Sequence, residues 1–117
     1  MNNLNNDSFN EIISLIKDGN LELAQNKVQS LLLEFPSSDI LLNLRGIIFL
    51  EKKEYEIAQS NFSEALKINP QFISAKLNLG SVYQNLGKSE EALNCFKEIK
   101  KINNTLPAVY NNMGFTL

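Results

Sequence analysis

The chain has 117 residues, of which 44% are apolar and 21% charged, a composition that suits one folded domain and argues against disorder. Its net charge is −2 and Arg45 is its single arginine, so it lacks the basic surface that binding along a nucleic-acid backbone requires. It contains no histidine and one cysteine, which removes the commonest general base, the commonest metal ligand and any disulfide framework.

The chain also lacks the features that direct a protein to or through a membrane. No apolar run approaches the ~20 residues of a membrane span. The first ten residues, MNNLNNDSFN, have neither the basic start nor the apolar centre of a signal peptide. We therefore expect a cytoplasmic protein that is not an enzyme, needs no cofactor or metal, and contacts neither nucleic acid nor a membrane.

An interval of 34 residues recurs along the chain for several residue types, and such a period is typical of repeat proteins. The residues that share it are Gly46, Gly80 and Gly114; Ala24, Ala58 and Ala92; Pro36 and Pro70; and Phe62 and Phe96. In this register three full repeats occupy residues 5–38, 39–72 and 73–106, and an incomplete fourth runs from 107 to 117. Within each repeat the apolar residues have helical spacing.

Turn signals divide each repeat into two helices. They lie at residues 18–20, 51–54 and 85–88. Gly19 and Gly87 suit the left-handed residue that often ends a helix, whereas Lys53 holds the same place in the middle repeat and is a poorer choice. Pro36 and Pro70 end the second helices, because proline disfavours a helical residue before it. Each repeat is therefore expected to be a helix–turn–helix unit.

These residues resemble the tetratricopeptide repeat. The third repeat matches that family's pattern at Leu79, Gly80, Tyr83, Gly87, Ala92 and Phe96, and the second matches it at Gly46, Tyr55, Ala58, Phe62, Ala65 and Pro70. The resemblance implies an all-α fold over residues 1–117, a single right-handed superhelical solenoid of antiparallel helix pairs with about seven helices. The first repeat departs from the pattern at Ile12, where the family has glycine, so we expect its helix pair to be the least regular.

Small residues occur where the two helices of a pair are expected to cross. A larger side chain at Gly46 or Gly80 would force the helices apart, so close packing there offsets the cost of about 1 kcal/mol for a glycine inside a helix. Glu11 and Arg45 are also 34 residues apart and occupy equivalent sites on neighbouring repeats. They either form a salt bridge or remain separately solvated.

In the family, the first helix of each pair lines the concave side of the superhelix, and the resemblance carries this groove onto specific positions here. The candidate groove residues are Phe9, Asn10, Ile13, Asn43, Leu44, Ile47, Leu77, Asn78, Ser81, Asn111 and Asn112. The lysine and arginine clamp with which some members hold the C-terminal carboxylate of a peptide is absent from these positions. A binder of chaperone tails is therefore disfavoured.

Asparagine recurs at the sixth position of a repeat in Asn10, Asn78 and Asn112, with Leu44 interrupting the series. An amide both donates and accepts hydrogen bonds, so it can pair with the backbone of an extended peptide, while apolar groove residues would supply most of the affinity. The series is similar to the asparagine ladder in the repeats of O-GlcNAc transferases. The alternative is that an asparagine-rich chain carries asparagine wherever solvent reaches.

The resemblance implies a protein–protein interaction scaffold that binds an extended peptide or a partner protein in its groove. Two alternatives remain open: the chain is the substrate-recruiting N-terminal arm of a larger transferase-like enzyme, or it forms a homodimer through its C-terminal helix. The helix expected from Pro107 onward lacks a partner helix, so we expect the chain to be a fragment of a longer array. Cys95 is expected to be a structural, half-buried thiol.

Overall fold

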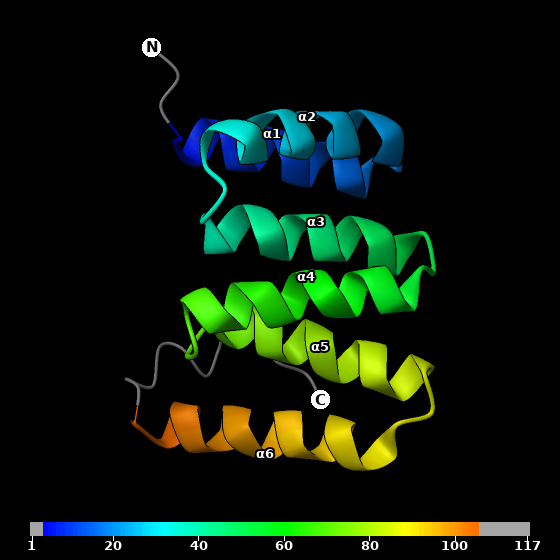
Figure 1. The fold of residues 1–117 in the computed structure, drawn as a ribbon, viewed down its shortest axis with the longest axis vertical. Helices are drawn as coiled ribbons and strands as arrows, with labels where there is room; N and C mark the ends of the chain where they lie inside the picture. Colours follow the sequence, from blue (N-terminus) through cyan, green and yellow to red (C-terminus); the bar gives the residue numbers. More distant parts are fainter. Residues whose placement is uncertain (1–3, 106–117) are drawn as a thin grey trace.

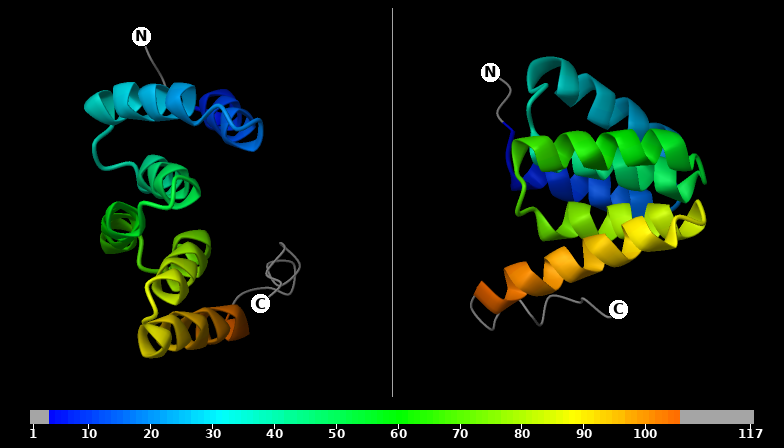
Figure 2. Two further views of the ribbon diagram at one scale, coloured as in Figure 1. Left: turned by 90° about the vertical axis from the view of Figure 1, so that its right-hand side faces the viewer. Right: turned by 60° about the horizontal axis from the view of Figure 1, so that its bottom comes forward.

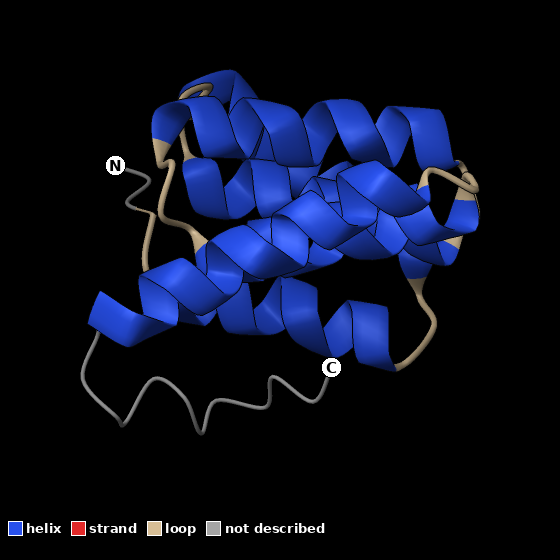
Figure 3. Cartoon of the chain, turned by 90° about the horizontal axis from the view of Figure 1, so that it is seen from below, coloured by secondary structure: helices blue, strands red, loops and turns tan. Residues whose placement is uncertain are grey.

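Six α-helices form the part of the chain that the computed structural model describes, residues 4–105 (Figure 1). They are α1 (Asn6–Lys17), α2 (Leu21–Glu34), α3 (Asp39–Glu51), α4 (Tyr55–Ile68), α5 (Ile73–Asn85) and α6 (Ser89–Thr105). Short loops join them, and no strand occurs within these residues (Figure 3). The all-α prediction is confirmed, and the seventh helix, expected over residues 107–117, lies outside the described residues. None of the described helices is both long enough and apolar enough to span a membrane.

The helices fall into three pairs, one in each of the intervals 5–38, 39–72 and 73–106. Each helix packs on the next one along the chain, and α3 also contacts α1 and α5. In the left view of Figure 2, α1, α3 and α5 lie on one side of the stack and α2 and α4 on the other. The stack curves, since α1 and α6 reach further out than α3 on the first of these sides. That side of the stack is therefore concave.

Each first helix ends in a left-handed residue, as the sequence predicts. The backbone angle φ is 81° at Gly19, 64° at Lys53 and 76° at Gly87. In each turn the left-handed residue and the one after it donate backbone N–H groups to carbonyls in the last turn of the helix. The three equivalent turns reverse the chain in the same way, so each first helix is followed by an antiparallel partner.

Proline ends the second helices of the first two repeats. Helix α2 stops at Glu34 and α4 at Ile68, each two residues before a proline. In the loop after α2, the N–H of Ser38 donates to the carbonyl of Phe35 at 3.2 Å. The hydroxyl of Ser38 then accepts the N–H of Leu41 at 3.2 Å and caps α3. Local chemistry therefore fixes both the end of one helix pair and the start of the next.

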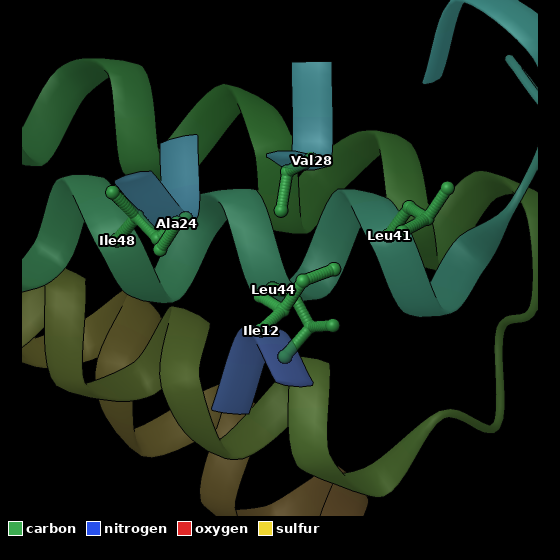
Figure 4. Close-up of a cluster of buried hydrophobic side chains, with 6 residues drawn as sticks. All are labelled: Ile12, Ala24, Val28, Leu41, Leu44 and Ile48. Atoms are coloured by element: carbon green, nitrogen blue, oxygen red, sulfur yellow. The ribbon is translucent and has the colours of Figure 1, made fainter. Parts of the chain in front are cut away.

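The core is divided into clusters that follow one another along the stack. The first lies between α1, α2 and α3 and comprises Ile12, Ala24, Val28, Leu41, Leu44 and Ile48 (Figure 4). A second joins α3 and α4 to α5 and α6 through Phe49, Ala58, Phe62, Leu79, Val82 and Cys95. Because each cluster bridges neighbouring pairs, stability comes from nearest-neighbour contacts, as in other stacked repeats.

Glycine allows the two helices of a pair to approach closely. A Cβ atom on Gly46 of α3 would collide with the ring of Phe62 on α4, and one on Gly80 of α5 would lie 2.7 Å from Cε1 of Phe96 on α6. Non-bonded carbon atoms prefer a separation of about 3.5–4.0 Å. The packing role that the sequence predicts for these two glycines is therefore confirmed.

The structure pairs Glu11 with Lys27 rather than with Arg45. The Nζ atom of Lys27 lies 2.7 Å from Oε1 of Glu11, and both side chains are almost half exposed. The partner comes from α2, the other helix of the same repeat, because that helix packs directly on α1. An ion pair as exposed as this contributes at most about 1 kcal/mol, so it is a minor part of the α1–α2 contact.

We predict that alanine at Gly46 or Gly80 destabilises the fold, although alanine is favoured over glycine in an unobstructed helix by about 1 kcal/mol. Gly46→Ala should lower the free energy of unfolding by about 2–3 kcal/mol, because Phe62 is fully buried and has no room to move. Gly80→Ala should cost about 1 kcal/mol, because Phe96 is only half-buried and can shift. Urea denaturation measures both values. A Gly46→Ala variant as stable as the parent chain would contradict the packing role.

We predict that Lys53→Gly stabilises the chain. A left-handed conformation costs an L-residue about 1–2 kcal/mol, and glycine avoids that cost while losing about 0.5–1 kcal/mol more backbone entropy on folding. The net gain in the free energy of unfolding should be about 0.5–1 kcal/mol. Lys53→Ala is the matched control, since it removes the same charged side chain but keeps the strained backbone. Equal thermal midpoints for the two variants would show that the strain at φ 64° is negligible.

Candidate functional site

Nine of the eleven predicted groove residues fall within the described residues, and all nine lie on α1, α3 and α5. Asn43 and Leu44 are buried, while Asn111 and Asn112 lie outside the described residues. The other seven are exposed or half-buried, and we call them the inner face: Phe9, Asn10, Ile13, Ile47, Leu77, Asn78 and Ser81. The structure thus brings most of the predicted residues onto the three helices that form the concave side of the stack.

Leu44 belongs to the core rather than to the floor of a groove. Its side chain is 5% exposed and joins the cluster between α1, α2 and α3, where Figure 4 shows it beside Ile12. The bulk of Ile12, which stands where the family has glycine, accounts for this contact. The apolar part of the inner face is consequently formed by Phe9, Ile13, Ile47 and Leu77.

Asn43 forms a small hydrogen-bonded cluster with residues of the next repeat. Its Nδ2 donates to the hydroxyl of Ser74 at 3.3 Å, and its Oδ1 accepts a hydrogen bond from Nδ2 of Asn78 at 3.2 Å. Asn43 is only 5% exposed, so these bonds satisfy polar atoms that water barely reaches. The cluster ties α3 to α5 on the concave side of the stack.

The same cluster orients Asn78, the asparagine that the sequence places at the sixth position of the third repeat. One N–H of its amide is used by Asn43, which leaves the second N–H and the carbonyl oxygen for other partners. Nearby, the hydroxyl of Ser81 donates to the carbonyl of Leu77 at 3.3 Å. The sequence gives no direct sign of this arrangement, because Asn43 and Asn78 differ in their position within the repeat.

A cavity of about 460 Å³ lies between the start of α1, the loop at 35–38 and the start of α3. Its lining residues are Leu4, Phe9, Phe35, Pro36, Ser37, Ser38, Asp39 and Ile40. In Figure 1 these segments meet at the left, where the loop descends from α2 to α3. Sequence reasoning missed the cavity because its walls come from three segments that only the fold brings together, although Phe9 was among the predicted groove residues.

Cys95 has the properties of a structural thiol. It is 6% exposed, and burial raises its pKa, with the negative charge of Glu98 acting in the same direction. Burial also raises the pKa of Tyr83, to which Cys95 and Glu91 add. Both groups therefore stay neutral near pH 7, and neither is prepared to act as a nucleophile or base. Within the described residues, no group of three histidine, cysteine or acidic side chains is arranged to hold a metal ion.

Comparison with known sequences identifies one matching family. The sequence profile described as "Tetratricopeptide repeat" matches residues 49–111. Among curated proteins, the Saccharomyces cerevisiae anaphase-promoting complex subunit CDC16 is 26% identical over 87 residues, which cover 68% of this chain and 10% of that protein. The TPR repeat-containing protein MJ1428 of Methanocaldococcus jannaschii is 35% identical over 63 residues, covering 54% of this chain and 11% of that protein. The chain thus spans about a tenth of the length of these relatives.

Comparison with solved structures finds the same arrangement of helices in other proteins. The second TPR of Spaghetti (RPAP3), bound to the HSP90 peptide SRMEEVD, superposes with a TM-score of 0.76 at 20% identity and covers 82% of this chain and 89% of that one. MamA from Desulfovibrio magneticus RS-1 gives 0.77 at 16% identity, covering 84% and 55%. At these identities the likeness establishes the fold.

We predict that the Cys95 thiol reacts slowly with alkylating reagents in the folded chain. Only the thiolate reacts, and because the folded pKa is raised above its usual value of 9.0, the thiolate fraction near pH 8 is lower than in the unfolded chain. Alkylation by iodoacetamide, followed by mass spectrometry, should therefore be much faster in denaturing urea, and its rate in the folded chain should still increase with pH above 9. A folded chain that reacts as fast as the unfolded one at pH 8 would contradict the burial of this thiol.

Proposed function

The chain belongs to the tetratricopeptide repeat family, and from this membership we propose that it is a protein-interaction scaffold whose inner face holds an extended peptide or a segment of a partner protein. Two of the similar proteins support this proposal through the peptides that they bind or the complex to which they belong. The RPAP3 repeats, which share this fold, are bound to chaperone peptides, and CDC16 is a subunit of a multiprotein complex. A fold shared with a peptide-binding protein suggests the mode of binding, whereas the ligand depends on the residues of the face.

The observation that carries the proposal is the placement of Asn78 by Asn43. An amide that is held at one N–H offers its carbonyl oxygen and its second N–H in a fixed direction. An extended peptide presents N–H and C=O groups along its backbone. One oriented amide can therefore both donate a hydrogen bond to a peptide C=O and accept one from a peptide N–H. Because Asn78 is already ordered by Asn43, binding there loses less side-chain entropy than binding by a free asparagine.

Apolar side chains on the inner face would supply the larger part of the binding energy. Ile13 is 36% exposed, and Ile47 and Leu77 are half-buried on the neighbouring helices α3 and α5. Removing this surface from water contributes roughly 25 cal/mol per Å² of apolar area. The amides would then position the ligand, and the apolar residues would supply most of its affinity.

The seven residues of the inner face are all uncharged, which favours a ligand unlike the acidic peptide SRMEEVD that is bound to the RPAP3 repeats. The seven residues of the inner face include no lysine or arginine, so they provide no cation for a carboxylate. We therefore propose a groove that does not depend on the carboxyl terminus or on acidic side chains of its ligand.

A peptide-display screen on the intact chain tests the proposal. Peptides selected by the parent chain should bind the Asn78→Ala variant about 2–10-fold more weakly, since the loss of one hydrogen bond costs about 0.5–1.5 kcal/mol. The matched control is Asn94→Ala, which removes an exposed asparagine on α6 and should change nothing. Circular dichroism checks that both variants remain folded. Equal binding of the selected peptides to Asn78→Ala and Asn94→Ala would exclude Asn78 from the site, and a screen that selects no peptide would contradict the scaffold function.

A further inference from the structure

We propose that the cavity between the start of α1, the 35–38 loop and the start of α3 receives a bulky apolar side chain that is flanked by lysine or arginine in a partner peptide. We call this cavity the N-terminal pocket, defined by its lining residues Leu4, Phe9, Phe35, Pro36, Ser37, Ser38, Asp39 and Ile40. The inference rests on the proposed function, because Phe9 belongs both to this pocket and to the inner face. It adds the chemical class of the ligand.

The size and lining of the pocket suit an apolar anchor. Its volume of about 460 Å³ lies within the range of about 300–1,000 Å³ that is usual for ligand pockets. Five of its eight lining residues are apolar. Two of these, Phe9 and Phe35, are partly buried against the first core cluster, so their rings form a wall that the fold holds in place. Ile40 is 38% exposed at the rim and is therefore available to a ligand.

The charges around the pocket favour a ligand with positively charged side chains. The lining residues include one carboxylate, Asp39, and no lysine or arginine, and a second carboxylate, Asp7, lies on α1 between the lining residues Leu4 and Phe9. Asp39 accepts hydrogen bonds from Nδ2 of Asn69 at 3.0 Å and from the backbone N–H of Ile40 at 2.9 Å. Both donors are neutral, so they orient the carboxylate without cancelling its charge.

The one lysine of helix α2, Lys27, is already engaged in an ion pair. Lys27 is paired with Glu11 at 2.7 Å, so it does not balance the carboxylates of the pocket. The surroundings of the pocket are therefore apolar inside and negative at the rim. A peptide with a leucine or phenylalanine next to basic side chains complements both properties, because its cations reach the rim when its apolar side chain enters the cavity.

Three capped peptides of equal length test the proposal by fluorescence anisotropy on the full chain. The first has a central leucine with two lysines on each side, the second replaces the lysines by glutamate, and the third replaces the leucine by alanine. The first peptide should bind at least about tenfold more tightly than either of the others, because only it matches both the cavity and the rim. Its affinity should fall as salt is added, since Asp7 is exposed and Asp39 is only half-buried, so dissolved ions screen both charges.

Two variants locate the binding. Ile40→Lys places a cation at the rim and should weaken binding of the leucine–lysine peptide at least about tenfold. Ile57→Lys is its matched control, because Ile57 is 41% exposed on α4, outside the pocket, and should leave binding unchanged. Asp39→Asn keeps the size of the side chain and should weaken binding about 2–5-fold. Circular dichroism confirms that each variant is folded.

The outcomes separate the pocket from the scaffold function as a whole. Equal binding of the three peptides, or equal effects of Ile40→Lys and Ile57→Lys, would overturn the pocket while leaving a groove that depends on Asn78 intact. Sedimentation of the free chain as a dimer that Ile40→Lys disrupts would also overturn it, since the occupant would then be a second copy of the chain. Weaker binding with Ile40→Lys and, to a smaller extent, with Asp39→Asn, but not with Ile57→Lys, supports the proposal.

Discussion

The close contact between a glycine in the first helix of a pair and a phenylalanine ring in the second is the constraint on which the remaining geometry depends. At Gly46 the ring of Phe62 occupies the space of an absent side chain, and at Gly80 the ring of Phe96 does the same. Because the two helices approach so closely, α3 with α4 and α5 with α6 each form a tightly packed unit with a buried contact between the two helices. The left-handed turns at Lys53 and Gly87 then only need to reverse the chain over a short distance.

Stacking these units leaves α3 and α5 with a side that none of the other helices within residues 4–105 covers. Helices α3 and α5 each contact their own partner and the neighbouring pairs, while their remaining side lies on the concave side of the stack (Figure 2). The inner face, whose residues come from α1, α3 and α5, combines half-buried apolar side chains with amides and a hydroxyl. A surface of this kind does not require a deep cavity to bind a chain, because an extended peptide can lie along neighbouring helices and contact each in turn.

The sequence predicted well the features that depend on contacts within one repeat. The 34-residue period located the helix pairs, the glycines at the seams and the left-handed turn at Lys53, since these follow from local backbone chemistry and from one helix packing on its partner. Features that depend on contacts between repeats were not predictable in the same way. Leu44 is buried because Ile12 in the preceding repeat packs against it, and Asn78 donates a hydrogen bond to Asn43, which holds a different position in the preceding repeat. The 34-residue period predicts which residues occupy the same position in successive repeats. The rotation between neighbouring repeats determines which residues at different positions come into contact.

The two parts of the proposed binding surface lie at two different contacts between repeats. The cluster around Asn43 and Asn78 is neutral, and amides pair with the backbone of a peptide whatever its sequence. The N-terminal pocket is apolar with a negative rim, so it responds to the side chain and charge of its ligand. The amides lie where α3 meets α5, and the pocket lies where α1 meets α3. In a peptide that reached both, the amides between α3 and α5 would therefore position the backbone, and the pocket between α1 and α3 would select the side chain and its charge. In a solenoid, changing the residues at one inter-repeat contact can alter selectivity without disturbing the backbone-binding amides of the next, because each contact is built from its own neighbouring pairs.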